Sequence, residues 1–189
     1  IEKTNKYDKN VYLYLINHPD EKYINRFHKE KVREIITPSI KINNMVKYKM
    51  NELKLTNKTF KVIHLRMYDD CFYNNHTNVT KKTINEIVNN LKHITNKHKD
   101  EDIFIISSSN FVKNKLINKF PTFKYMNENI THIANPLLND DINIMNTFIE
   151  FYIMSHANFI YSFSVYEHGS GFSKWCAVAY NIPYICFKI

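Results

Sequence analysis

The chain has 189 residues, a formal net charge of +8 and a hydrophobic content of 44%, which includes 13 tyrosines and 13 phenylalanines. This length suits one domain, or one domain with part of another, and so much apolar surface excludes an intrinsically disordered chain. The positive charge would suit a polyanion, but the lysines are scattered and no nucleic-acid-binding motif accompanies them, so no specific nucleic acid is expected.

The cysteines and the apolar windows bear on the compartment. Cys71, Cys176 and Cys186 are odd in number and lack CxxC spacing, which argues against a disulfide framework and a zinc site. They favour a cytoplasmic location, and a secretory lumen is the alternative if an N-terminal anchor precedes the chain. No signal peptide is recognisable, and the most apolar window, 142–165, contains Glu150 and a histidine, so no transmembrane segment is expected.

Residues 1–58 predict a mainly helical segment with one strand. The run 11–16 is short, apolar and β-prone, and residues 21–36 carry apolar side chains at helical spacing. Ser39 follows a break and is placed to cap a second helix.

From residue 59 to 189 the pattern becomes a regular alternation of strands and helices. Strands are predicted over 60–65, 102–107, 158–162 and 183–187, with short extended segments at 123–126 and 131–133. Helices are predicted over 81–97, 110–119, 141–155 and 170–180, and the third should bury Ile144, Phe148, Phe151 and Tyr152. This order predicts an α/β fold, a Rossmann-like parallel sheet with helices on both faces, preceded by the helical segment.

Ligands of such sheets bind beyond the carboxyl ends of the strands. The segment 164–173, "SVYEHGSGFS", lies at such an end and contains Gly169 and Gly171, the two glycines of the chain, where average usage would give about 13. Glycines let a backbone approach a ligand closely, and a helix N-terminus attracts anions. Ser170 and Ser173 add hydroxyl donors, so the segment predicts an anion site, although a tight turn before a helix is the alternative.

The segment "HLRMYDD" (64–70) leaves the first predicted strand at the same edge. An arginine at this position, Arg66, can hold a phosphate with two parallel hydrogen bonds. The alternative is a surface ion pair of Arg66 with Asp69 or Asp70. His64 lies within the strand, where a hydrogen-bonded core histidine is the simpler interpretation.

Two stretches resemble a known family. "HLRMYD" (64–69) matches the H-x-R-x-x-D pattern that opens the nucleotide-sugar domain of GDP-fucose-dependent fucosyltransferases, the α1,2-, α1,6- and protein O-fucosyltransferases. "FIEFYIMSHANFIYSFSVYEHGSGFSKWCAVAYNIP" (148–183) looks like the closing block of the same group. With the order of strands and helices, the resemblance covers roughly residues 35–189.

The resemblance implies the C-terminal half of a GT-B fold. Residues 1–58 would then be a remnant of, or a linker from, the acceptor-side domain, because they are too few to form all of it. It implies a glycosyltransferase that moves fucose from GDP-fucose to a glycan or protein acceptor, with no metal ion and no cofactor besides the sugar donor. Arg66 would hold the β-phosphate and stabilise the leaving diphosphate, and Asp69 is the acid of the same motif; these are the implied catalytic residues. The implied donor-binding residues are His64, which would face the nucleotide, Arg66, Glu150, which would read the guanine edge, and Ser170, Gly171, Phe172 and Ser173, which would surround the pyrophosphate.

Several positions depart from the family pattern. Met67 stands where the α1,2- and α1,6-type enzymes have a second arginine, and Tyr68 where related motifs often have a small residue. These departures leave open another GDP-sugar or a UDP-sugar, and a non-catalytic binding or structural module with the same fold. A catalytic base is not identified, although Asp70 and Glu167 are candidates by position. A basic nucleic-acid-associated protein is the third reading, which predicts strongly salt-dependent binding.

Overall fold

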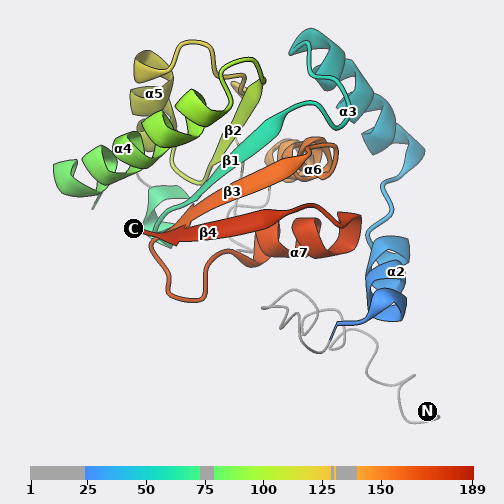
Figure 1. The fold of residues 1–189 in the computed structure, drawn as a ribbon. Helices are drawn as coiled ribbons and strands as arrows, with labels where there is room; N and C mark the ends of the chain where they lie inside the picture. Colours follow the sequence, from blue (N-terminus) through green and yellow to red (C-terminus); the bar gives the residue numbers. More distant parts are fainter. Residues whose placement is uncertain (1–23, 73–78, 129, 131–139) are drawn as a thin grey trace.

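The computed structural model describes residues 24–72, 79–128, 130 and 140–189 (Figure 1). The elements follow the order α2 (Arg26–Ile35), α3 (Ile40–Glu52), β1 (Lys61–Arg66), the 3₁₀ helix η3 (Asp69–Phe72), α4 (Lys81–Lys97), β2 (Ile103–Ser107), α5 (Asn110–Lys119), α6 (Asp141–Ser155), β3 (Phe159–Ser164), α7 (Gly171–Tyr180) and β4 (Tyr184–Lys188). The strand predicted at 11–16 and the extended segment predicted at 131–133 lie outside the described residues.

The four strands form one parallel sheet in the order β2-β1-β3-β4. In the centre of the sheet, Lys61 of β1 lies opposite Ile103 of β2 and Phe159 of β3. A single bridge between Phe104 and Lys124 extends the outer side of β2, where the sequence predicts an extended segment. The predicted α/β fold with a Rossmann-like parallel sheet is confirmed.

Helices cover both faces of this sheet (Figure 1). Because side chains alternate along a strand, Val62 of β1 packs in a core with α3, α6 and α7, whereas Ile63 packs in a second core with α4 and α5. Helix α2 packs on α7, where the Arg33 guanidinium donates two hydrogen bonds to the Ala179 carbonyl, at 2.7 and 2.9 Å. Helices α2 and α3 therefore pack against the same domain as the sheet. The origin of residues 1–58 in an acceptor-side domain stays a prediction.

The predicted bounds of α4, α5 and α6 agree with the structure, but the predicted buried face of α6 is wrong at Phe148, which is 37% exposed. The face that α6 turns inward carries Ile149 and Ile153 together with buried polar residues. These are Asn146, Thr147 and Glu150. The apolar residues of α6 surround most of the helix, so periodicity alone could not orient it.

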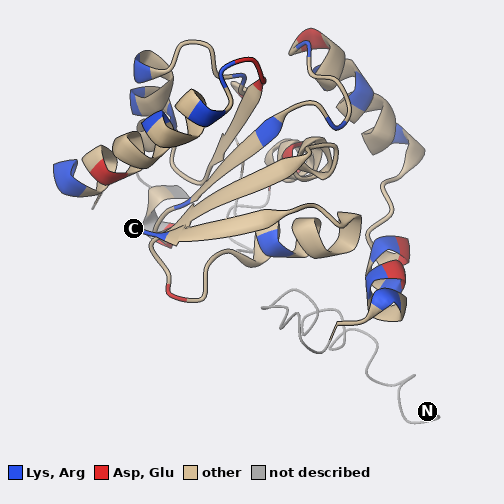
Figure 2. Ribbon diagram, viewed as in Figure 1, with Lys and Arg blue, Asp and Glu red and all other residues tan. Residues whose placement is uncertain are grey.

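Basic side chains are spread over α2, α3, α4 and α5 rather than gathered in one place (Figure 2). Among the described residues, no helix is long and apolar enough to cross a membrane.

A polar network closes the amino edge of the sheet. The Glu101 carboxylate forms an ion pair with Lys61 (2.8 Å), and its other oxygen lies within hydrogen-bond distance of His98 Nδ1 (2.7 Å). The other ring nitrogen of His98 lies 2.8 Å from the Tyr161 hydroxyl, and the Asn158 amide donates to Glu101 at 3.2 Å. The network joins the end of α4 to β1 and β3, and we take its role to be stability, because ligands of such sheets bind at the opposite edge.

The network predicts an acid-sensitive contribution to stability. The hydrogen bond from Lys61, followed by those from His98 and Asn158, lowers the pKa of Glu101 to about 2, from 4.5. A depressed acid stabilises the fold above its unfolded pKa, and this stability is lost as the pH falls from 4.5 through 2. Glu101→Gln should therefore cost about 1 kcal/mol near pH 6, a small value because solvent screens the pair.

Urea unfolding at several pH values checks this result. The difference between wild type and Glu101→Gln should shrink as the pH approaches 2. Glu167→Gln is the matched control, because the Glu167–Lys188 pair is exposed and should contribute almost nothing. A difference that stays constant from pH 6 to pH 2 would contradict the assignment.

Candidate functional site

The candidate site lies at the carboxyl edge of the sheet, where β1 and β3 end side by side. The register places Arg66, the last residue of β1, opposite Ser164, the last residue of β3. After Ser164 the chain turns, and α7 begins at Gly171. The two segments that the sequence singles out therefore meet at one edge, as predicted from the parallel topology.

Arg66 is held in place by three groups. Its Nη2 lies 2.5 Å from Asp69 Oδ1, its Nη1 donates to the Met67 carbonyl at 3.3 Å, and its guanidinium carbon lies 5.1 Å from the centre of the Tyr166 ring. The Arg66 side chain is 16% exposed and that of Asp69 is 54% exposed. The Arg66–Asp69 ion pair, which the sequence left open, is thus present, and a phosphate at Arg66 has to share the guanidinium with Asp69 or displace it.

The N-terminus of α7 differs from those of the other described α-helices. Those helices each have a cap residue whose side chain accepts a backbone N–H: Asn25, Ser39, Thr80, Ser109 and Asp140. Ser170, the cap of α7, makes no such bond. Its hydroxyl is buried without a hydrogen-bond partner in the described structure, and the residue is 2% exposed. The first N–H groups of α7 therefore lack the internal acceptor that the other helices have.

The two glycines serve different purposes. Gly169 has φ +79°, and a Cβ there would lie 3.2 Å from the Cys186 sulfur, so the turn itself requires glycine. Gly171 is the first residue of α7 and is not among the residues with positive φ. Alanine also adopts such a φ, so a left-handed backbone does not explain this glycine.

His64 lies buried beneath the start of α7. Its Nδ1 is 3.0 Å from Ser173 Oγ, and the Ser173 hydroxyl in turn donates to Ser162 Oγ at 3.3 Å. Burial, aided by the charge of Arg66, lowers the pKa of His64 to about 3. The imidazole is therefore neutral, and its ring lies 5.5 Å from that of Phe172. The core-histidine interpretation describes this geometry, and a contact of His64 with a nucleotide stays a prediction.

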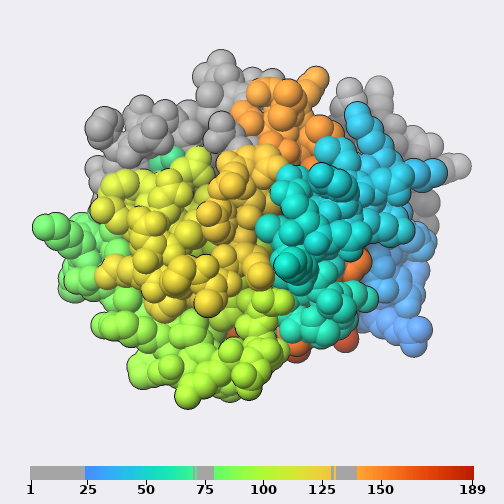
Figure 3. All heavy atoms as spheres, turned by 90° about the horizontal axis from the view of Figure 1, so that it is seen from above, coloured from blue at the N-terminus to red at the C-terminus, as the bar shows by residue number. Residues whose placement is uncertain are grey.

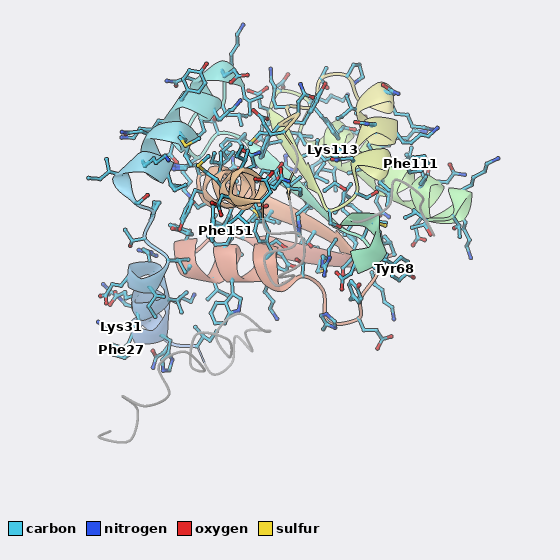
Figure 4. All side chains as sticks on the ribbon, turned by 180° about the vertical axis from the view of Figure 1, so that it is seen from behind. Phe27, Lys31, Tyr68, Phe111, Lys113 and Phe151 are labelled. Atoms are coloured by element: carbon cyan, nitrogen blue, oxygen red, sulfur yellow. The ribbon has the colours of Figure 1, made fainter. Side chains whose placement is uncertain are left out.

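Glu150 is fully buried on α6, and both of its carboxyl oxygens lack a hydrogen-bond partner within the described structure. Burial raises its pKa to about 8, opposed by the charge of Lys113 and assisted by that of Glu128. Lys113 is itself buried and donates to the Met126 carbonyl at 2.9 Å. Figure 4 shows Lys113 on α5 and Phe151, the neighbour of Glu150, on α6. An unpartnered buried carboxyl is costly, which makes Glu150 a candidate ligand-binding group.

The two candidate bases lie in the segments that follow β1 and β3. Asp70 lies in η3, and its side chain is outside the description. Glu167 is exposed and pairs with Lys188, which lowers its pKa. The structure thus leaves the general base unassigned.

Two features of the site were not predicted from the sequence. Tyr166, which belongs to the 164–173 segment, contacts Arg66 and Asp69 of the other segment. Its place in the glycine-containing segment is the only feature of the sequence that points to it. Met67 is fully buried, and its N–H donates to Ser108 Oγ at 2.8 Å. An arginine side chain at 67 would lie in the apolar core beside α4, which explains why this chain has methionine there.

A hollow of about 290 Å³ lies between α3 and residues 123–128. Figure 3 shows α3 against the segment near residue 120 on this face of the molecule. Its lining does not include Arg66, Glu150 or any residue of the 164–173 turn. It is therefore separate from the candidate site.

Similarity to known proteins is found among solved structures and not among sequences. No family model matches the sequence, and no curated protein matches it. Among solved structures, POFUT1 in its apo-form and in complex with GDP-fucose each align with a TM-score of 0.49 at 14% identity, and POFUT1 in complex with GDP aligns with a TM-score of 0.49 at 15% identity. Each alignment covers 80% of this chain and 47% of the other. The chain thus spans about half the length of these structures, and its function has to be argued from its own residues.

Proposed function

We propose that the carboxyl edge binds a nucleoside diphosphate sugar and that the protein is a metal-independent glycosyltransferase of the GDP-fucose-dependent type. It would transfer fucose to a glycan or protein acceptor. The observation that carries the proposal is the N-terminus of α7. This terminus lacks a side-chain cap, begins with a glycine whose φ is not positive, and follows a buried serine hydroxyl without a partner in the described structure.

The chemistry of a diphosphate suits this helix terminus. Free N–H groups and the helix dipole favour an anion there. Gly171 lets phosphate oxygens approach the backbone, and the Ser170 hydroxyl is an additional donor. Phe172 and Ser173 complete the first turn, and Ser173 is anchored to His64.

The same groups suit the reaction. When the bond between the sugar and the diphosphate breaks, negative charge builds up on the departing phosphate. Fixed positive donors lower the barrier to that step. Arg66, which stays charged at any physiological pH, and the N–H groups of α7 would supply them. Asp69, paired with Arg66, would release or share the guanidinium as the phosphate binds.

Glu150 supports guanine as the base. Its two unpartnered oxygens match the two adjacent N–H donors on the edge of a guanine ring, whereas uracil offers one N–H between two carbonyls. Binding would give this buried carboxyl the partners that it lacks in the free protein.

A non-catalytic binding module is the second candidate. Asp69 already pairs with Arg66, and Met67 stands where the α1,2- and α1,6-type enzymes have a second arginine. This module would bind GDP but would neither transfer nor hydrolyse the sugar of GDP-fucose. Release of free fucose from GDP-fucose, measured over hours with and without the Arg66→Ala change, separates the two candidates.

Substitutions at the two glycines test the anion site. Gly171→Ala should keep the stability of wild type or raise it by about 0.5 kcal/mol, because alanine suits a helix. The added methyl group should nevertheless weaken GDP binding about tenfold, because it stands where a phosphate approaches the helix terminus. Calorimetric titration with GDP, GMP, UDP and ADP, together with thermal unfolding, gives both quantities.

Gly169→Ala is the control with the opposite outcome. Alanine at a positive φ costs about 1–2 kcal/mol, and the Cys186 contact adds to that cost, so this variant should lose stability. If Gly171→Ala leaves the affinity for GDP unchanged, the N-terminus of α7 is not part of the binding site. Equal affinities for GDP and GMP in the wild-type protein would refute the diphosphate site.

A further inference from the structure

We infer that Tyr166 is a positioning residue that holds Arg66 and the turn before α7 in one arrangement. The inference rests on the proposed function, since it concerns how the same diphosphate site is organised. Tyr166 lies in the loop between β3 and α7, and it contacts both segments that form the site.

On the side of β1, Tyr166 contacts both partners of the ion pair. The Arg66 guanidinium lies over its ring, with the central carbon 5.1 Å from the ring centre. The Tyr166 hydroxyl accepts a hydrogen bond from the Asp69 N–H at 3.2 Å. A planar guanidinium on an aromatic face keeps one orientation, so Tyr166 limits where Arg66 and Asp69 can move.

On the side of α7, the backbone of Tyr166 closes the turn. Its carbonyl accepts the Gly169 N–H at 3.0 Å, and its N–H donates to Ser164 Oγ at 3.1 Å. The Ser164 hydroxyl then donates to the Gly169 carbonyl at 3.2 Å. The turn that delivers Ser170 to the start of α7 is therefore built around the residue that carries Arg66 on its ring.

The surroundings of the ring favour a rigid arrangement. His168 stacks on Tyr166 with ring centres 5.3 Å apart, and Tyr68 meets it edge to face at 6.1 Å. Tyr68 is 43% exposed, and its ring contacts the edge of the same site through Tyr166. Tyr68 therefore offers a matched aromatic control beside the same site.

The test measures the order of Arg66 and the affinity for GDP in the same variants. Arg26, Arg33 and Arg66 are the arginines of this sequence, so the Nε–H signals in an NMR spectrum can be assigned by substitution. The Arg26 Nε–H donates to Glu30 in a solvent-exposed ion pair, whereas the Arg33 Nε–H donates to the Ala179 carbonyl in a partly buried contact. The two serve as the weakly and the strongly protected references. The variants are Tyr166→Phe, Tyr166→Leu and Tyr68→Leu.

In the wild type, hydrogen exchange at the Arg66 Nε–H should be slow, as we also expect for Arg33. Tyr166→Leu should speed it toward that of Arg26 and weaken GDP binding about tenfold, while thermal unfolding shows the protein still folded. Tyr166→Phe keeps the ring and should retain both properties within about threefold. Tyr68→Leu removes only the edge-to-face contact with the Tyr166 ring and leaves that ring on Arg66, so both properties should change less than in Tyr166→Leu.

Unchanged exchange at Arg66 in Tyr166→Leu would overturn the inference, whatever happens to GDP. Loss of order in Tyr166→Leu with unchanged GDP affinity would also overturn it, because Arg66 would then need no positioning. If the wild type binds no GDP, the proposed function fails, and the exchange of Arg66 still decides whether Tyr166 orders that side chain.

Discussion

Replacing Arg66 by alanine should weaken GDP binding about 100-fold, because a phosphate loses charge-assisted hydrogen bonds that are worth about 1.5–3 kcal/mol each. GMP should bind both proteins with nearly the same weak affinity, since the lost interaction is with the second phosphate. Calorimetric titration of the two nucleotides against wild type and variant measures the difference.

A second variant, Arg66→Lys, and thermal unfolding distinguish a role of Arg66 in phosphate binding from a role in stability. Lysine keeps the charge but lacks the planar fork and the stacking on Tyr166, so affinity should fall about tenfold. The ion pair with Asp69 is partly exposed and contributes at most about 1 kcal/mol, so stability should change little. A large loss of stability in Arg66→Ala, with GDP binding intact, would make the arginine structural.

Glu150→Gln should make the free protein more stable and less able to bind GDP. The folded protein keeps the Glu150 proton up to a pKa of about 8, whereas the unfolded chain releases it near 4.5. The unfolded state therefore binds fewer protons between these values, and the stability of the wild type falls as the pH rises through this window. Glutamine does not titrate. The free energy of unfolding of Glu150→Gln should therefore equal that of the wild type near pH 4.5 and exceed it by about 3 kcal/mol at pH 7.

Thermal unfolding of both proteins from pH 4.5 to pH 8 tests the burial of this carboxyl. The gap at neutral pH should be about 10 °C in Tm, and parallel curves would show that Glu150 does not remain protonated inside the fold. GDP titration tests its role. If guanine donors bind the carboxylate, binding near pH 7 should release a proton in the wild type but not in Glu150→Gln, whose affinity should fall about tenfold.

The alternation of strands and helices was predictable because each element carries its own signal. Helix α4, for example, has one apolar stripe and a threonine cap, and both are visible in the sequence. Helix α6 has apolar residues almost all round, so the sequence did not reveal that Phe148 faces outward and Glu150 inward. The orientation is set by packing against α3 and α7, which no local pattern encodes.

The site was predictable only in part. Arg66 and the 164–173 segment follow from the rule that parallel strands end at one edge. The sequence could not choose between a phosphate and Asp69 as the partner of Arg66, because both satisfy the same charge. The contact of Tyr166 with Arg66 joins residues about 100 positions apart, and single-sequence patterns carry no information on such pairs.

The strand order also has a consequence for how the chain reaches this structure. Every neighbouring pair in the sheet is parallel, and β1 borders β3 even though Lys61 and Phe159 are about 100 residues apart, so folding requires the closure of long loops. During synthesis, β1 and β2 can associate early, whereas the other edge of β1 stays unpaired until β3 has been made. We therefore expect slow folding with a populated intermediate, in which this unpaired flank is the surface most exposed to aggregation.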